Sequence, residues 1–259
     1  MGAYANDVKH RTRLDALLVA RGLAASRERA RALILAGQVR VDGRVVSKAG
    51  APVPPESDVT LAQADHPYVG RGGVKLAHAL DVFSIDVTGR IALDVGASTG
   101  GFTDVLLRRG ARAVVALDVG HGQLDWTLRN DPRVIVLERV NARTLDVDRL
   151  PPDARAFDVV TVDVSFISLR QVLPTIAPLV RADGDLVTLV KPQFEAGRGE
   201  VGKGGLVRDP AVHARVIDEV TAAANALGLT RVGDTSSPIA GAEGNREFFL
   251  HFRQKTIEP

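Results

Sequence analysis

Four charged residues that are far apart in the sequence stand beside apolar runs of a predicted sheet: Lys75, Asp163, Lys191 and Glu247. Asp163 and Lys191 each end an apolar strand, Glu247 opens the last strand, and Lys75 lies on a helix before the first. In doubly wound sheets, ligands bind beyond the carboxyl ends of the parallel strands. We expect the last strand to be antiparallel, so that its start lies at that same edge. All four side chains are therefore expected at one edge of the sheet.

These residue types could together remove a proton from a hydroxyl group. A lysine acts as a base only when its pKa is depressed, which a second lysine and desolvation can achieve. We expect Lys191 to be the base or the main hydroxyl contact and Lys75 to assist, while Asp163 and Glu247 orient them. Any one of these residues alone would more often form a strand-end ion pair, but four at one edge favour a functional site.

A glycine-rich turn at residues 94–101 (DVGASTGG) follows an apolar strand and leads directly into a helical segment. Such a turn exposes backbone N–H groups at a helix N-terminus. It is neither the G-x-G-x-x-G fingerprint nor a P-loop. The next strand ends in Asp118, roughly 20 residues further on, where a carboxylate can accept hydrogen bonds from ribose hydroxyls.

This pattern favours an S-adenosylmethionine (SAM) site over an ordinary αβ turn with a solvent-facing acid. The expected cofactor-binding residues are Asp94, Gly96, Ala97, Ser98, Thr99, Gly100, Gly101, Asp118 and Asn141. Beside a methyl donor, two lysines and two acids suit methylation of a ribose 2′-hydroxyl, with much of the rate coming from alignment. Methylation of a base amine is a distant alternative, because residues 163–166 (DVSF) lack the prolines of an Asp-Pro-Pro-Tyr motif.

Composition bounds the class of protein. The 259 residues, 45% hydrophobic and 25% charged, suit a main domain and a small one in a soluble protein. The absence of cysteine excludes disulfides, thiolate metal sites and a cysteine nucleophile. No apolar run approaches the ~18 residues of a membrane span, and residues 1–7 lack a signal-peptide core, so we expect a cytoplasmic protein. The six histidines show no ligand spacing; we expect no metal, and a monomer.

Positive charge is concentrated in residues 1–48, which hold ten Lys and Arg residues against four acidic ones. The pattern predicts helices at 14–23 and 27–36, a hairpin around Asp42-Gly43 and a strand at 59–61. A basic lobe suggests a polyanionic partner, although a solvated charged helix face is the alternative.

Residues 195–209 are predicted to be a mobile loop near the substrate, and Trp126 is expected to pack.

Residues 13–27 and 36–43 resemble the small RNA-binding domain first described in ribosomal protein S-four. That resemblance implies RNA contacts through basic side chains. The expected RNA-binding residues are Arg11, Arg13, Arg27, Arg29, Arg31, Arg40 and Arg71. The predicted organisation is an RNA-binding domain at 1–61, a linker at 62–70 and a methyltransferase domain at 71–259. Predicted strands of the second domain are 91–95, 113–118, 134–138, 159–163, 186–190, 231–234 and 247–252, and a helix is predicted at 211–227.

The whole chain resembles the TlyA family of rRNA 2′-O-methyltransferases, historically called haemolysin A. The matching segments are 68–76 (YVGRGGVKL), 94–107, 116–134, 163–169 (DVSFISL), 189–197 (LVKPQFEAG) and 244–250 (GNREFFL). The resemblance implies a Rossmann-like, FtsJ-like α/β domain with a mostly parallel seven-stranded sheet, its last strand antiparallel, after a small α+β domain. It further implies SAM as cofactor and methylation of cytidine ribose in ribosomal RNA of the large subunit and, in some members, the small subunit.

The resemblance makes Lys75, Asp163, Lys191 and Glu247 a catalytic tetrad. Gly70 departs from the family pattern, where a serine is expected; the departure lies in the linker and bears on the coupling of RNA binding to catalysis, not on the chemistry. Two other classes remain open: a pore-forming haemolysin, which the SAM turn and the basic lobe argue against, and a non-catalytic RNA-binding protein that retains a SAM fold, which an intact tetrad argues against.

Overall fold

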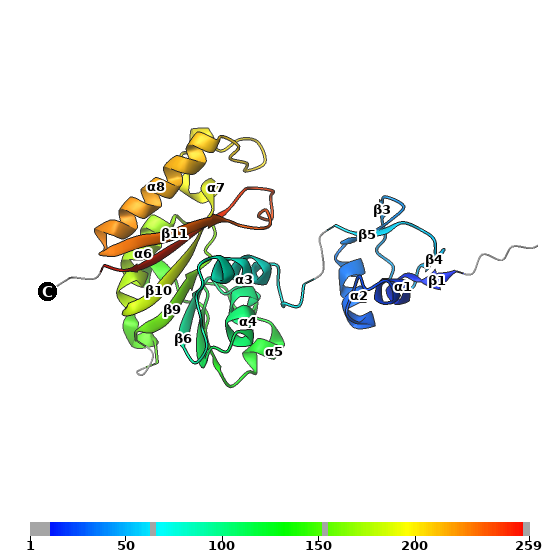
Figure 1. The fold of residues 1–259 in the computed structure, drawn as a ribbon, viewed down its shortest axis with the longest axis horizontal. Coiled ribbons are helices and arrows are strands. Elements are labelled where there is room, and N and C mark those ends of the chain that lie inside the picture. The colour runs from blue at the N-terminus through cyan, green and yellow to red at the C-terminus, as the bar shows by residue number, and fades with distance from the viewer. Residues whose placement is uncertain (1–10, 63–65, 152–154, 256–259) are drawn as a thin grey trace, which may run out of the picture. The chain divides into compact units, whose positions relative to one another are not determined.

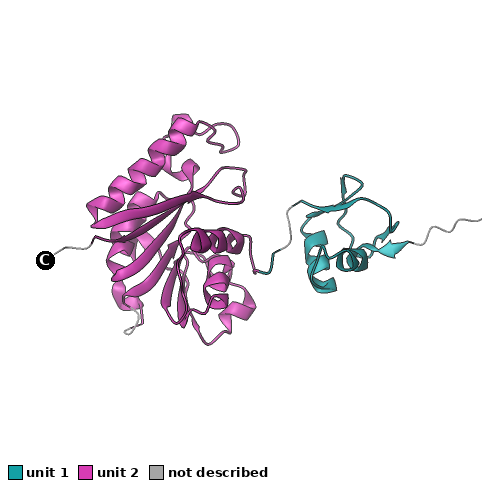
Figure 2. Ribbon diagram, viewed as in Figure 1, with its two compact units in different colours: residues 1–67 teal, residues 68–259 magenta. Residues whose placement is uncertain are grey.

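The computed structural model describes residues 11–62, 66–151 and 155–255. It divides into two compact units, Met1–Pro67 and Tyr68–Pro259 (Figure 2). The division falls inside the predicted linker at 62–70. Residues 63–65 of that linker, and the N-terminal segment considered for a signal peptide, lie outside the described residues.

Unit 1 is a small α+β structure with its own core. Its elements are β1 (Thr12–Arg13), α1 (Leu14–Ala20), α2 (Arg27–Leu35), β2 (Val39–Val41), β3 (Arg44–Val45), β4 (Pro52–Val53) and β5 (Val59–Leu61). The Ser26 hydroxyl caps α2 by accepting from the Arg29 N–H at 3.1 Å. Asp42 and Gly43 both have positive φ, as a tight hairpin turn between β2 and β3 requires. Apolar side chains of α1 and α2 fill the core.

Unit 2 is built on a seven-stranded sheet in the order β11-β12-β10-β9-β6-β7-β8 (Figure 1). The strands are β6 (Ile91–Val95), β7 (Ala113–Leu117), β8 (Val134–Leu137), β9 (Phe157–Val162), β10 (Val180–Val190), β11 (Leu229–Ser236) and β12 (Phe248–Gln254). The pairs from β8 to β10 are parallel, and β12 is antiparallel to both neighbours, as the sequence predicted.

Helices cover both faces of this sheet (Figure 1). The helices are α3 (Gly72–Val82), α4 (Gly101–Arg108), α5 (Trp126–Arg129), α6 (Leu169–Ile176), α7 (Pro192–Glu195) and α8 (Pro210–Ala226), with short 3-10 turns at Ala142–Thr144, Val147–Arg149, Ala177–Leu179 and Arg198–Glu200. Helices α3 and α4 share one apolar core, and α6 and α8 share the other. Among the described residues, no helix is long and apolar enough to cross a membrane.

Strand register determines which residues meet at the carboxyl ends of the parallel strands. Val190 on β10 pairs with Phe248 on β12, so Lys191 and Glu247 are neighbours beyond the paired strands. Val95 on β6 pairs with Val162 on β9, so the glycine turn starts beside Asp163. For Asp163, Lys191 and Glu247, the predicted convergence at one edge therefore follows from backbone pairing.

A buried carboxylate joins the opposite end of the sheet. Asp185 is 1% exposed and accepts hydrogen bonds from His251 (2.8 Å), Arg253 (2.8 Å) and Arg90 (2.7 Å). Burial alone would raise the pKa of Asp185, but these hydrogen bonds outweigh it and lower the pKa to about 2. Asp185 therefore stays ionised and links β10, β12 and the turn before β6.

Candidate active site

One cavity of about 440 Å³ is lined by Lys75, Asp163, Lys191 and Glu247, the four residues expected at the edge of the sheet. They form two ion pairs. Lys75 Nζ lies 2.5 Å from Glu247 Oε2, and Lys191 Nζ lies 2.6 Å from Asp163 Oδ1. The cavity thus presents two lysine nitrogens, each held by one carboxylate.

The two pairs differ in burial. The side chains of Lys75 and Glu247 are only 10% and 3% exposed, whereas those of Lys191 and Asp163 are 11% and 19% exposed. Lys191 Nζ also donates to the Ser165 hydroxyl at 2.9 Å, a contact that the sequence analysis missed. Lys191 occupies the N-cap position of α7 without a side-chain capping bond, and Pro192 takes the first helical position.

A second cavity, of about 530 Å³, lies beside the glycine turn. Four of the nine predicted cofactor residues line it: Gly96, Ser98, Asp118 and Asn141. It shares four lining residues with the first cavity, namely Ser98, Asp163, Ser165 and Phe166. The two cavities are therefore adjacent, and a group bound in the second cavity would lie next to the lysine–carboxylate pairs.

Position 96 requires glycine for two reasons, its backbone conformation and its close approach to Asp163. Its φ is +86°, and a Cβ there would lie 2.3 Å from the Asp163 carbonyl oxygen. The turn can therefore approach the end of β9 only because residue 96 has no side chain.

The rest of the predicted cofactor set forms the frame of the turn. Ala97, Gly100 and Gly101 are buried and Thr99 is exposed, and none of them lines the second cavity. Asp94 is fully buried and accepts from Thr103 Oγ1 at 2.7 Å and Thr161 Oγ1 at 3.2 Å. Burial raises the pKa of Asp94 to about 7, against the lowering effect of the Thr103 hydrogen bond.

The second cavity fits an adenosyl group by the chemistry of its donors and its apolar walls. Asp118 directly follows β7, and its carboxylate is held by the N–H groups of Ser98 (2.8 Å) and Gly120 (2.6 Å). It faces the cavity with lone pairs left for ribose hydroxyls. Apolar lining comes from Val119, Val140, Ile167 and Val172.

Three predicted RNA-binding arginines surround one buried acid in unit 1. Asp15 is 0% exposed, and its carboxylate is paired with Arg13 (2.9 Å), Arg27 (3.1 Å) and Arg31 (3.4 Å). Hydrogen bonds, the strongest from Arg13, lower the pKa of Asp15 despite its burial. Each of the three arginine side chains remains more than half exposed, so the cluster presents positive charge in fixed positions.

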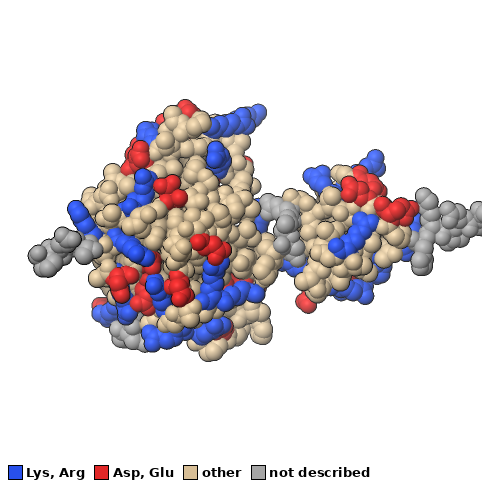
Figure 3. All heavy atoms as spheres, in the orientation of Figure 1, with Lys and Arg blue, Asp and Glu red and all other residues tan. Residues whose placement is uncertain are grey.

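The other predicted RNA-binding residues are separate from this cluster. Arg11 and Arg40 are exposed, and Arg29 donates to the His66 carbonyl at 3.4 Å. Arg71, in unit 2, is exposed and lines the cavity of the lysine pairs. On the face shown in Figure 3, basic and acidic side chains are interspersed over both units.

Phe166 at the cavity wall was not predicted, and the structure also tests what the sequence suggested for Trp126 and Gly70. Phe166 is 88% exposed, has a φ of +63°, and lies with its ring 5.1 Å from that of Phe194 at the cavity wall. Trp126 is 75% exposed, so the expectation that it packs was wrong. Gly70 lies against the glycine turn, where a Cβ would come within 2.8 Å of Thr99 Oγ1.

Comparison with known proteins agrees with this geometry. The family model described as FtsJ-like methyltransferase matches residues 68–254, and that described as S4 domain matches residues 12–59. A solved structure from Listeria monocytogenes, described as a putative S-adenosylmethionine dependent methyltransferase, has the same fold, with a TM-score of 0.53 at 14% identity over 72% of this chain and all of that one. The fold and site thus define a methyltransferase of the FtsJ-like class with an S4 domain.

Closer relatives narrow the assignment. The 16S/23S rRNA (cytidine-2′-O)-methyltransferase TlyA of Mycobacterium tuberculosis is 51% identical over 95% of this chain and 91% of its own. A solved structure from Streptococcus thermophilus, described as a putative hemolysin, has a TM-score of 0.74 at 42% identity, covering 97% of this chain and 91% of its own. This chain belongs to the TlyA family.

Proposed function

We propose that this chain transfers a methyl group from SAM to the 2′-hydroxyl of cytidine in ribosomal RNA. The observation that carries the proposal is the pair of lysine–carboxylate contacts lining one cavity, directly beside a second cavity under the glycine turn. The mycobacterial relative is named for this activity.

The residues of the two cavities have separate roles. When bound, SAM supplies an electrophilic methyl group. Gly96, Ser98, Asp118 and Asn141 would hold it, with Asp118 accepting from its ribose hydroxyls. Lys191 would be the base or the main contact of the RNA hydroxyl, with Asp163 and Ser165 fixing the direction of its nitrogen.

Unit 1 would supply the affinity for RNA. The half-exposed arginine side chains around Asp15 are held in fixed positions by its carboxylate, which suits contact with phosphates. Arg71 lines the catalytic cavity and is placed to contact RNA near the reacting nucleotide. We propose ribosomal subunits as the partner, acted on in the cytoplasm by a monomer without a metal ion.

The proposal is tested with purified protein, tritiated SAM and ribosomal subunits, followed by mapping of ribose methylation. Lys191→Ala and Asp163→Ala are expected to abolish transfer while the Kd for SAM stays within several-fold. The exposed Lys255 at the end of β12 gives the matched control, and Lys255→Ala should act like the wild type. Wild-type rates in either tetrad variant would refute the assignment.

The same preparation separates the other classes. A pore-forming haemolysin would release dye from liposomes, which we do not expect of this protein. A non-catalytic RNA-binding protein would bind subunits without transferring label. Either result with the wild-type protein, in the absence of methyl transfer, would overturn the proposal.

A further inference from the structure

Glu195 is a buried carboxylate that lies outside both cavities. It is 5% exposed and ends α7, where the sequence analysis placed the start of a mobile loop. Burial raises the pKa of Glu195 above its ordinary value. Burying an acid is unfavourable unless its oxygens are well bonded, so its contacts indicate what it does.

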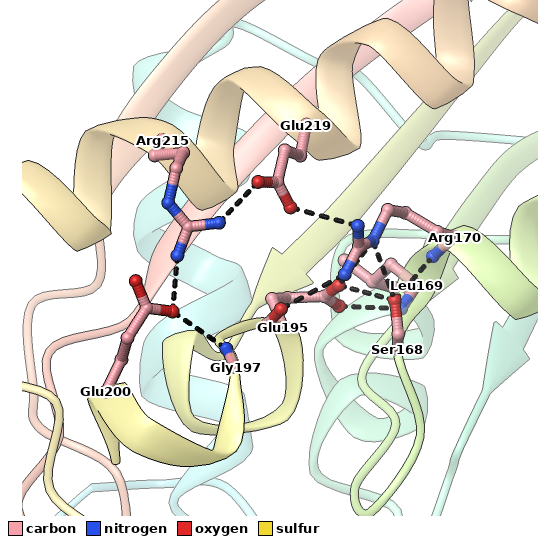
Figure 4. A network of polar contacts seen from close by, with 8 residues as sticks. All are labelled: Ser168, Leu169, Arg170, Glu195, Gly197, Glu200, Arg215 and Glu219. Carbon is pink, nitrogen blue, oxygen red and sulfur yellow. Dashed lines mark hydrogen bonds and ion pairs between the residues drawn. The ribbon is translucent and has the colours of Figure 1, made fainter. Parts of the chain in front are cut away.

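The Glu195 carboxylate binds the start of α6 with both oxygens (Figure 4). Oε2 accepts from the Ser168 hydroxyl at 2.5 Å, and Oε1 accepts from the Leu169 N–H at 2.6 Å. Arg170 lies 3.4 Å from the carboxylate and donates to the Glu195 carbonyl at 3.0 Å. The carboxylate is thus fixed by one hydroxyl, one backbone N–H and one guanidinium.

These contacts join the two segments that carry the Lys191–Asp163 pair. Lys191 and Glu195 stand at opposite ends of the single turn α7. Asp163 and Ser165 lie on the short segment that ends at Ser168, the cap of α6. The two segments therefore meet twice, at Lys191 in the cavity and at Glu195 behind it.

An outer chain of ion pairs continues from Arg170 (Figure 4). Arg170 pairs with Glu219 on α8 at 2.9 Å, Glu219 pairs with Arg215, and Arg215 lies 2.5 Å from Glu200, which accepts from the Gly197 N–H at 2.8 Å. These side chains are about a third or more exposed, so solvent weakens each pair. The inner carboxylate is the strongly held member of the network.

We propose that Glu195 is a positioning residue that keeps Lys191 in register with Asp163 and Ser165 during methyl transfer. The proposal rests on the proposed function, because Glu195 touches neither cavity and acts only through Lys191. Misplacing a reacting group by about 1 Å can lower a rate about 10²-fold. Loss of the contacts between Glu195 and the start of α6 should therefore slow the chemical step rather than weaken binding.

Single-turnover methyl transfer, at saturating SAM and subunits, tests this. Glu195→Ala should lower the rate constant about 10²-fold, with affinities for SAM and subunits changed less than about threefold. Glu195→Gln should lose less, because its amide oxygen still accepts from the Leu169 N–H. Glu200→Gln, which alters only the outer chain, is the matched control and should act like the wild type.

Non-additivity separates positioning from general stability. In a Ser165→Ala background, which removes one partner of Lys191 but leaves its amine, Glu195→Ala should lower the rate much less than it does in the wild type, because residues that act as a unit are not additive. A second large loss there, or a variant that weakens binding without slowing transfer, would overturn the proposal. If Glu195→Ala does not fold, Glu195→Gln and Ser168→Ala decide: wild-type rates in both refute it. An inactive wild type would instead remove the proposed function itself.

Discussion

The ion pair between Lys75 and Glu247 allows stability and activity to be separated. The two side chains are 10% and 3% exposed, and their charged atoms are 2.5 Å apart. We consider Glu247→Leu, Lys75→Met and the combination of both. Each single change leaves one charge buried without its partner, whereas the double change replaces the pair by apolar groups of similar volume.

Breaking a buried pair costs about 3–5 kcal/mol, and replacing both members by apolar residues is often neutral or stabilising. Because both side chains are nearly inaccessible, solvent offers little compensation. For a unit of this size, each kcal/mol corresponds to about 2–4 °C in Tm. Each single variant should therefore melt at least about 6 °C below the wild type, and the double variant close to it.

Calorimetry of the three variants, beside methyl transfer to ribosomal subunits, provides the measurement. All three should be inactive, because each removes part of the tetrad, but only the single variants should lose stability. A single variant that melts like the wild type, or a double variant as unstable as the single ones, would show that the pair is not desolvated as described. An active double variant would refute a catalytic role for Lys75.

Three further changes probe other parts of the chain. Gly96→Ala places a Cβ 2.3 Å from the Asp163 carbonyl at a φ of +86°, so we expect at least tenfold weaker SAM binding by calorimetric titration, and unchanged affinity would contradict the fit. Asp185 has a pKa lowered to about 2, so its stabilisation of about 2 kcal/mol is present above pH ~4 and lost as the pH falls towards 2; Asp185→Asn should be less stable at pH 7 and lose less stability on acidification, as urea unfolding would measure. Arg40→Ala should reduce the slope of log affinity for RNA against log salt by about 1; an unchanged slope would place Arg40 outside the interface.

The sequence was most informative where local pattern and chemistry coincide. The strand ends at Asp163 and Lys191 were predictable because an apolar run closed by one charge indicates both a buried strand and its ligand-side end. The antiparallel last strand then determined where Glu247 would lie. Which residues of the glycine turn contact the cofactor was harder to predict, since all eight adjacent residues belong to one motif. Only the backbone geometry shows that Gly96 and Ser98 line the cavity.

Side-chain networks between distant segments were not predictable. Nothing local to Asp15 indicates that Arg27 and Arg31 pack against its carboxylate, because that contact depends on how two helices meet. Glu195 looked like the start of a loop, since its partners lie 26 and 27 residues earlier in the chain. Phe166 and Trp126 are apolar, and their exposure contradicts the usual burial of such residues.

By itself, the sequence determined the class of fold and the four residues of the lysine–carboxylate pairs, because periodicity, turn glycines and strand-end charges are local properties of the chain. Its motifs also indicated the family, by resemblance. Only the tertiary structure decided which lysine pairs with which acid, which turn residues face the cavity, and that Glu195 joins the two segments behind Lys191. Those outcomes depend on strand register and helix packing, which bring together atoms that the chain order keeps far apart.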